Sequence, residues 1–340
     1  MSTQPTICIY GAGSIGCYVG GRLAAAGARV VLIGRARMGE ELAAHGLHVT
    51  DYRGAAIDVG PAAFEYSIDT TRLRSADLIL VTVKSAATAA AGADISRFAR
   101  ADAIVISLQN GIGNDGVLRA AAPQNCVLAG MVQFNVAAYG EGRFHQGSEG
   151  GLGVAADSAL SAFLTAFERA GLALAQHADI AAVQWAKLLL NLNNAVNALS
   201  GLPLKAQLAQ RAYRRCTALA QDEGLHALAA ARIRPARLTA VPPAWIPRVL
   251  RLPDALFRRI AARMLAIDPL ARSSMQDDLR AGRVTEVDWL NGEIAKLARK
   301  HSVAAPANER LVELVHAAER GGQTHWSGDA LLAQLESCRC

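Results

Sequence analysis

One short segment places an amine and several amides in an otherwise apolar stretch, and these residue types at this spacing could do chemistry. The segment runs Trp185-Ala186-Lys187-Leu188-Leu189-Leu190-Asn191-Leu192-Asn193-Asn194. On an ideal helix Asn191 lies about 40° from Lys187, and Asn194 lies about 20° away on the other side. A buried lysine is rare and its pKa shifts readily. The pattern therefore predicts either one polar wall of a site, or a core helix whose lysine reaches solvent beside solvated amides.

A glycine-rich turn lies between two apolar strands within the first forty residues, and it could hold a dinucleotide. The motif runs Gly11-Ala12-Gly13-Ser14-Ile15-Gly16. It follows a strand expected over 6–10, and a helix then leads to a second strand over 28–33. Here Gly11 permits a tight turn, Gly13 lets the backbone approach a pyrophosphate, and Gly16 allows the helix to pack closely on the strand. The helix N-terminus offers free N–H groups to phosphate oxygens.

The residues after the second strand predict which dinucleotide is bound. NAD sites place an acid at this position for the ribose hydroxyls. This chain has Gly34-Arg35-Ala36-Arg37 instead, and its first acid is Glu40. A guanidinium can bind a 2′-phosphate through two hydrogen bonds. The predicted cofactor is therefore NADP(H), with Arg35 as a cofactor-binding residue; the alternative is an ordinary surface arginine.

Two more apolar strands, expected over 77–83 and 103–108, end in polar residues. Lys84 and Asn110 follow them directly. Ligands bind at the carboxyl edge of a parallel sheet that is covered on both faces. Both residues are therefore candidates for contact with cofactor or substrate, although each could instead close a turn.

The strand signals stop near residue 177, and helical patterns follow. A hairpin is expected around 139–143, and a Pro-rich irregular connection or lid over 232–253. Helices are expected over 181–200, 205–231, 254–280, 286–300 and 307–320. The predicted fold class is an α/β N-terminal Rossmann-type dinucleotide-binding domain (1–178) followed by an all-α C-terminal substrate-binding domain (179–340).

Composition excludes several functional classes. Net charge is +6, spread over arginines without a dense basic run, so no nucleic-acid partner is expected. Six cysteines show no metal-ligand spacing, which predicts reduced thiols and no metal. No signal peptide or membrane span is visible. We expect a cytoplasmic protein that binds a small molecule, and the apolar helical half makes a homodimer plausible.

Six motifs, taken together and in order, resemble the ketopantoate reductase (2-dehydropantoate 2-reductase) family. They are Gly11–Gly16, Val83-Lys84, Gln109-Asn110-Gly111-Ile112-Gly113, Trp185–Asn191, Ser273-Ser274-Met275-Gln276-Asp277 and Thr285–Gly292. The resemblance covers nearly the whole chain. It implies NADPH-dependent reduction of 2-dehydropantoate to (R)-pantoate, a step toward pantothenate and coenzyme A.

The same resemblance implies roles for single residues. Lys187 matches the general acid and Glu286 the carboxylate that faces the substrate, while Asn191 and Ser274 match substrate-binding residues. An ammonium group can stabilise the oxyanion formed by hydride attack and then donate a proton. An alternative for Glu286 is the first turn of a helix capped by a Thr285–Asp288 box.

The resemblance also implies roles for residues that flank these. Lys84, Asn110 and Glu286 match positions near the nicotinamide, and Asn110 also matches the substrate cleft. The family often has a second asparagine four residues after the first, where this chain has Ala195. Asn194 lies closer to Lys187 on the helix and is the expected substitute in binding substrate.

Two alternative functions stay open at this point. The Asn194 shift and the Pro-rich insert are compatible with a related NADP-dependent reductase of another branched 2-oxo acid, or of an imine. A protein that senses NADPH without turnover is the other alternative. The joint presence of Lys187, Ser274 and Glu286 favours an enzyme, because a sensor needs no proton donor.

Overall fold

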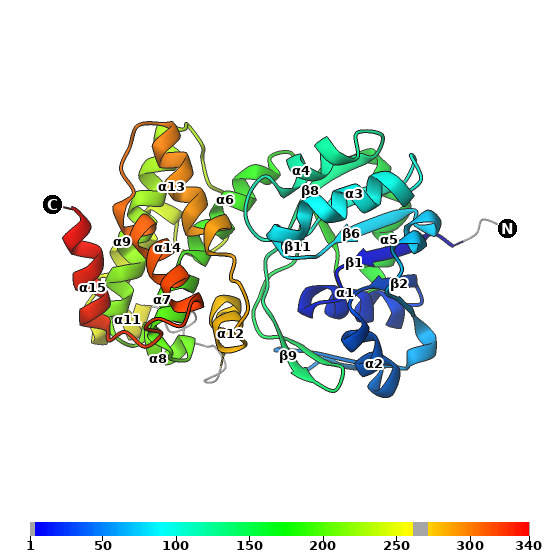
Figure 1. Cartoon of the computed structure of the whole chain (residues 1–340), viewed down its shortest axis with the longest axis horizontal. Helices are drawn as coiled ribbons and strands as arrows, with labels where there is room; N and C mark the ends of the chain where they lie inside the picture. The colour runs from blue at the N-terminus through cyan, green and yellow to red at the C-terminus, as the bar shows by residue number, and fades with distance from the viewer. Residues whose placement is uncertain (1–3, 261–270, 340) are drawn as a thin grey trace. The chain divides into compact units, whose positions relative to one another are not determined.

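The computed structural model describes residues 4–260 and 271–339, and the chain divides into the units Met1–Ile180 and Ala181–Cys340 (Figure 1). All strands of the described residues lie in the first unit, which also has helices, and the second unit is helical. The predicted succession of an α/β unit and an all-α unit is thereby confirmed for the described part of the chain.

The first unit is built on an eight-stranded sheet in the order β12-β11-β8-β7-β6-β1-β2-β5. Its strands are β1 Thr6–Tyr10, β2 Arg29–Ile33, β5 Glu65–Ser67, β6 Leu78–Val81, β7 Ile104–Ser107, β8 Cys126–Val132, β11 Leu152–Ala155 and β12 Leu174–His177. The strands from β5 to β8 are parallel and follow the order 3-2-1-4-5-6 of dinucleotide-binding sheets. At the other end of the sheet β11 runs antiparallel to β8 and parallel to β12.

Helices cover both faces of this sheet, which explains why its strands are apolar throughout. They are α1 Ser14–Ala25, α2 Ala36–His45, α3 Thr88–Phe98, α4 Asn114–Ala121 and α5 Ser161–Arg169, with 3₁₀ turns at Pro61–Ala63, Thr70–Ser75, Ser85–Ala87 and Ser158–Leu160. Ile7 and Ile9 of β1 join one apolar core with α1 and α5. Cys8, which points the other way, joins a second core with α3 and α4.

A second sheet, in the order β4-β3-β10-β9, packs against α1. Its strands are β3 Leu47–Asp51, β4 Ala56–Val59, β9 Val136–Gly140 and β10 Arg143–Gln146. The hairpin predicted around 139–143 is confirmed, because β9 and β10 pair antiparallel. The β3–β4 hairpin and α2 were not predicted.

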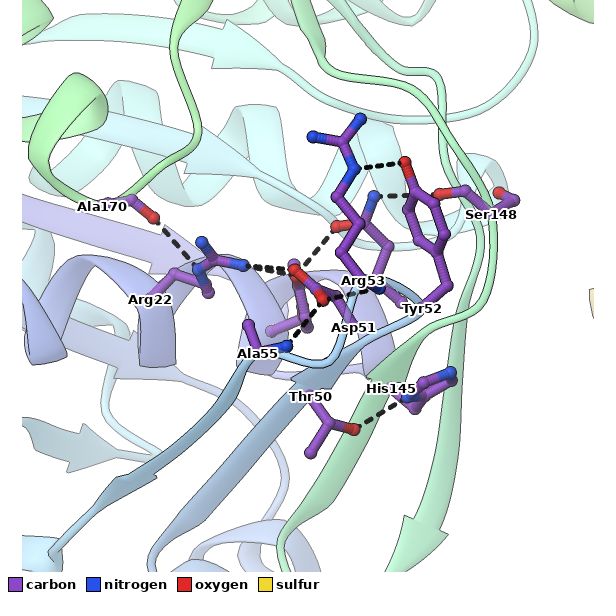
Figure 2. Close-up of polar contacts among 11 residues, drawn as sticks. Arg22, Thr50, Asp51, Tyr52, Arg53, Ala55, His145, Ser148 and Ala170 are labelled. Carbon is purple, nitrogen blue, oxygen red and sulfur yellow. Dashed lines mark hydrogen bonds and ion pairs between the residues drawn. The ribbon is translucent and has the colours of Figure 1, made fainter.

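Arg22 on α1 links the second sheet to the rest of the unit, as Figure 2 shows. Its Nη1 lies 3.4 Å from Asp51 Oδ2 at the end of β3, and its Nε donates to the Ala170 carbonyl at 3.0 Å. Tyr18, one turn earlier, donates to Gln146 on β10 at 2.8 Å. Side chains from one face of α1 therefore hold that helix, which begins at the glycine-rich turn.

The second unit consists of helices grouped around α9, a helix of 20 residues. Its helices are α6 Ile180–Asn191 (whose first residue belongs to the first unit), α7 Asn193–Ser200, α8 Leu204–Leu208, α9 Arg211–Ala230, α10 Ile246–Leu250, α11 Asp254–Ile260, α12 Ser274–Arg280, α13 Asn291–Lys300, α14 Pro306–Glu319 and α15 Gly328–Glu336, with 3₁₀ turns η5 Pro243–Trp245, η6 Val287–Trp289 and η7 Ser337–Arg339.

The helical predictions locate most of these elements but miss their breaks. The pattern over 181–200 is divided at Leu192, and the pattern over 205–231 is divided between α8 and α9. The predicted 254–280 helix includes residues 261–270, which lie outside the described residues. The segment 232–253 is irregular as predicted until η5 and α10, and α15 was not predicted.

A buried arginine on α9 fixes the end of the Pro-rich segment. Arg214 is fully buried and donates to the carbonyls of Leu208, Leu250 and Leu252 at 3.0, 3.0 and 2.7 Å. Its guanidinium also lies 2.8 Å from Asp254. One side chain thus satisfies carbonyls at the ends of two short helices, which have few backbone partners of their own.

Replacing Arg214 by methionine tests this arrangement. Arg214→Met leaves three carbonyls without their donor, and we expect the free energy of unfolding to fall by about 3 kcal/mol or more. The neighbouring Arg215 is exposed and pairs with Glu336 on the surface, so Arg215→Met is a matched control expected to change stability by under about 1 kcal/mol. Urea unfolding of both variants measures the difference, and equal stabilities would contradict the role of Arg214.

Candidate active site

The glycine-rich turn is closed on its inner side and open at its tip. Gly11 has φ +120°, and a Cβ there would lie 2.6 Å from Val83 N. A Cβ on Gly16 would lie 2.8 Å from Thr82 Oγ1, while one on Gly13 would meet nothing within 4 Å. Gly11 and Gly16 are therefore required by packing, and Gly13 leaves room for a ligand against the backbone.

The turn leads into a helix whose first N–H groups have no side-chain cap. Helix α1 begins at Ser14, Gly13 is its N-cap, and its first turn has no acidic residue. Ala12 is buried, while Ser14 and Ile15 are half-buried. Free N–H groups and the positive end of the helix dipole suit a pyrophosphate.

Arg35 stands at the end of β2, where the sequence analysis placed it. Its side chain is exposed, its backbone is the N-cap of α2, and its carbonyl accepts a hydrogen bond from Tyr66 at 2.7 Å. Arg37 is exposed in the first turn of the same helix, which contains no acid there. Two guanidinium groups and a helix N-terminus therefore gather positive charge where NAD sites place an acid.

A network of buried side chains supports Asn110 and was not predicted. Asn114, the first residue of α4, donates to the Asn110 carbonyl at 2.7 Å. Ser85 donates to the same carbonyl at 3.1 Å, and Asn114 in turn donates to Ser85 Oγ at 3.2 Å. In the sequence, the polar residues that follow Lys84 and Asn110 could have indicated this network.

The same network also bonds to the backbone of Val83, the residue before Lys84. Gln109 donates from Nε2 to the Val83 carbonyl at 3.1 Å and to Thr88 Oγ1 at 2.7 Å. Thr88 bonds to Asn114 at 2.8 Å, which joins this part to the Asn110 support. The ends of β6 and β7 are thereby tied together, and the backbones at Lys84 and Asn110 are held at one sheet edge.

Lys187 lies within a buried stretch of α6. Its side chain is 8% exposed, and burial lowers its pKa to about 8. The Leu189 carbonyl on the same helix accepts a hydrogen bond from Gln221 of α9 at 3.0 Å, which ties α6 to the middle of the helical unit. An amine that titrates near neutral pH is well suited to proton transfer.

The amides that follow Lys187 have different surroundings. Asn193 is engaged with Gln207, at 3.1 and 3.3 Å, and with Thr217 at 2.7 Å. Asn191 and Asn194 are half-buried, whereas Ala195 is fully buried. The backbone at Leu192 keeps a right-handed helical conformation across the break. Asn193 is thus a packing residue, whereas Asn191 and Asn194 are only half-buried.

Ser274 owes its position to an asparagine that the sequence analysis missed. Asn197 on α7 is fully buried; it accepts from Ser273 N and donates to the Leu202 carbonyl, both at 2.9 Å. Ser273 caps α12 by accepting from Gln276 N at 3.2 Å. Ser274 is therefore the first residue of α12, with an exposed side chain.

Glu286 is half-buried at the start of η6, in a turn that differs from the expected capping box. Thr285 Oγ1 accepts from Val287 N at 3.2 Å, and Asp288 bonds to His316 on α14 at 2.9 Å. The box fails because the chain makes a 3₁₀ turn here and α13 begins only at Asn291.

The predicted site residues are divided between the two units. The glycine motif, Arg35, Lys84 and Asn110 belong to the first, and Lys187, Asn191, Asn194, Ser274 and Glu286 to the second. Within residues 4–260 and 271–339 no group of His, Cys, Asp or Glu could hold a metal ion. In the same part of the chain, no helix is both long and apolar enough to cross a membrane.

A sheet of this order, with a glycine-rich turn where the order reverses, defines a Rossmann-type dinucleotide-binding protein. The family model "Ketopantoate reductase PanE/ApbA" matches residues 7–157, and the model of that family's C-terminal part matches residues 179–319. The chain belongs to the ketopantoate reductase family, whose members are oxidoreductases.

Curated relatives agree with this assignment. The chain is 31% identical over 327 residues to a 2-dehydropantoate 2-reductase of Halobacterium salinarum, covering 93% of this chain and 99% of that protein. It is 29% identical over 339 residues to the 2-dehydropantoate 2-reductase of Pyrococcus horikoshii, covering 93% and 98%.

Solved structures share the fold. A PanE/ApbA family ketopantoate reductase from Ralstonia eutropha is 28% identical and superposes with a TM-score of 0.79 over 93% of this chain and 99% of that one. D-mandelate dehydrogenase with NADH and anilino(oxo)acetate has a TM-score of 0.77 at 22% identity, over 93% and 99%, and shows likeness of fold alone.

Proposed function

We propose that this protein reduces 2-dehydropantoate to (R)-pantoate with NADPH, in pantothenate and coenzyme A synthesis. Family membership over both halves of the chain supports the reaction class. The single observation that carries the catalytic part is the buried Lys187, whose pKa of about 8 leaves it protonated yet ready to donate at neutral pH.

The residues of the first unit fit a dinucleotide. Gly11, Ala12, Gly13, Ser14, Ile15 and Gly16 would hold the pyrophosphate against uncapped N–H groups, and Arg35 would bind the 2′-phosphate. When bound, the nicotinamide cofactor supplies the hydride. Lys84 and Asn110, held by the buried network, would line the cofactor and substrate.

The residues of the second unit would bind the 2-oxo acid and move the proton. The Lys187 ammonium stabilises negative charge on the substrate oxygen and then gives that oxygen a proton from Nζ. Asn191, Asn194 and Ser274 supply neutral donors and acceptors for the hydroxyl and carboxylate groups of the substrate. Glu286 accepts hydrogen bonds from the substrate hydroxyl and orients it.

Replacing Lys187 tests the proton donor. We expect Lys187→Met to lower kcat at least about 100-fold while the Kd for NADPH stays within about threefold. In the parent enzyme kcat for reduction should fall as pH rises through about 8, because the amine loses its proton there. Stopped-flow NADPH oxidation measures both effects, with exposed Lys300→Met as control. Unchanged turnover in Lys187→Met would remove Lys187 as the acid.

Replacing Arg35 tests the cofactor. The parent enzyme should prefer NADPH over NADH in kcat/KM, and Arg35→Ala should reduce that preference about tenfold or more, since a guanidinium–phosphate pair is lost. Arg29→Ala changes an exposed arginine at the other end of β2 and should leave the preference unchanged. Equal rates with both cofactors in the parent enzyme would refute the assignment of NADPH.

A substrate panel decides between this reaction and its alternatives. We expect kcat/KM with 2-dehydropantoate to exceed the values with 2-oxoisovalerate and larger 2-oxo acids by at least about tenfold. The buried Ala195 and half-buried Asn194 favour the second candidate, a reductase of another branched 2-oxo acid, which a higher rate with a larger substrate would establish. Binding of NADPH without turnover of any 2-oxo acid would indicate a sensor. A homodimer and a cytoplasmic location stay predictions.

A further inference from the structure

His316 on α14 bonds to a carboxylate at each of its two ring nitrogens. Nδ1 lies 2.9 Å from Glu319 Oε2, and Nε2 lies 2.9 Å from Asp288 Oδ1. An ionised carboxylate only accepts hydrogen bonds, so both ring nitrogens must donate, and only the imidazolium has two N–H groups. The geometry is therefore that of a protonated histidine bridging two acids.

One of these acids bonds to the backbone before Glu286, and the other belongs to the turn that follows Glu286. Glu319 uses its other oxygen, Oε1, to accept from Thr285 N at 2.8 Å. Asp288 belongs to η6, which follows Glu286 directly. One ring on α14 is thus connected to the residue before Glu286 and to the residue two positions after it.

We propose that His316 is a positioning residue: its charged ring clamps the turn Thr285–Asp288 and so fixes the direction of the Glu286 carboxylate. This inference rests on the proposed function, in which Glu286 binds the 2-oxo acid. Loss of the ring proton removes one of the two N–H donors, so one acid is released and one side of the turn loses its anchor.

The charges around the ring favour its protonated form. Burial alone would lower the pKa of His316, but the hydrogen bonds to Glu319 and Asp288 outweigh it and raise that pKa above its usual 6.5. The pKa of Glu319 shifts in the other direction. Burial would raise this pKa, but the hydrogen bonds from His316 and Thr285 outweigh burial and lower it. The bridge is therefore complete below pH 6.5 and is lost as pH rises through the elevated pKa of His316.

Among the described residues, the other ion pairs on α14 and on the elements packed against it do not involve His316. On α13, Glu293 pairs with Lys296, and Arg299 with Glu309 of α14 itself. Helix α7 has no titratable side chain. On α14, α9 and α15 the further pairs are Arg310–Glu313, Arg214–Asp254, Arg251–Asp222 and Arg215–Glu336, and Glu223 bonds to Ala307 and Asn308. Among the described residues, Asp288 and Glu319 are thus the charged groups bonded to His316.

Helix α14 does not need His316 in order to pack. Its start is held by Glu223, which accepts from the backbone N–H groups of Ala307 and Asn308 at 3.0 Å. Its apolar face is buried through Leu311, Leu314 and Val315. A change at His316 should therefore act on the Glu286 turn and spare the fold.

His316→Gln tests the inference, because glutamine can bond to one acid and has no charge. We expect KM for 2-dehydropantoate to rise about tenfold or more at pH 6.5, with kcat within about threefold and the Kd for NADPH unchanged. In the parent enzyme KM should rise with pH as His316 loses its proton, whereas in His316→Gln it should be high and flat. His301→Gln, which changes the histidine that follows α13, is the matched control and should keep the parent profile.

Two further measurements keep the result decisive. Hydrogen exchange at the Thr285 and Val287 amides should be at least tenfold faster in His316→Gln, and Asp288→Asn should reproduce the KM effect if the histidine variant folds poorly. Parent-like KM, pH profile and amide exchange in a folded variant would overturn the positioning role. Absence of 2-oxo acid turnover in the parent protein would instead refute the proposed function, and amide exchange then still decides whether the clamp exists.

Discussion

The burial of the Lys187 ammonium is the constraint around which the helical unit is arranged. A pKa lowered from 10.5 to about 8 corresponds to about 3 kcal/mol of unfavourable free energy at neutral pH. The rest of the unit must offset that cost and keep α6 in place. Gln221 holds the Leu189 carbonyl, and Asn193 is bonded to two neighbouring helices. The same desolvation makes the proton available near physiological pH.

Both units support their site residues in the same way, with buried amides and hydroxyls bonded to backbone atoms. Asn114 and Ser85 hold the Asn110 carbonyl, and Asn197 holds the start of α12. Such groups are costly to bury unless they are bonded, and once bonded they allow few alternative conformations. The proposed site residues therefore lie on backbone whose conformation is fixed by neighbouring buried side chains.

Local motifs predicted the fold class and supplied the candidate site residues. The glycine turn between two strands was found from its spacing alone, although the contacts that require Gly11 and Gly16 include Val83 and Thr82, about seventy residues later in the chain. The β3–β4 hairpin was missed, because its sheet is completed by pairing β3 with β10, about a hundred residues later in the chain. The alternative of a Thr285–Asp288 capping box does not hold, because the chain makes a 3₁₀ turn there, and His316 from a distant helix bonds to the Asp288 carboxylate.

By itself, the sequence determined the class of protein, the dinucleotide turn and the identity of the lysine and its neighbouring amides. These depend on residue type and spacing, which are local properties of the chain. Tertiary structure decided the surroundings of each residue after Lys187: Asn193 is bonded to its neighbours, Asn191 and Asn194 are half-buried, and Ala195 is buried. It also decided that the pKa of Lys187 is lowered and that of His316 is raised. Burial and hydrogen-bond partners come from segments far apart in the chain, so no local pattern specifies them.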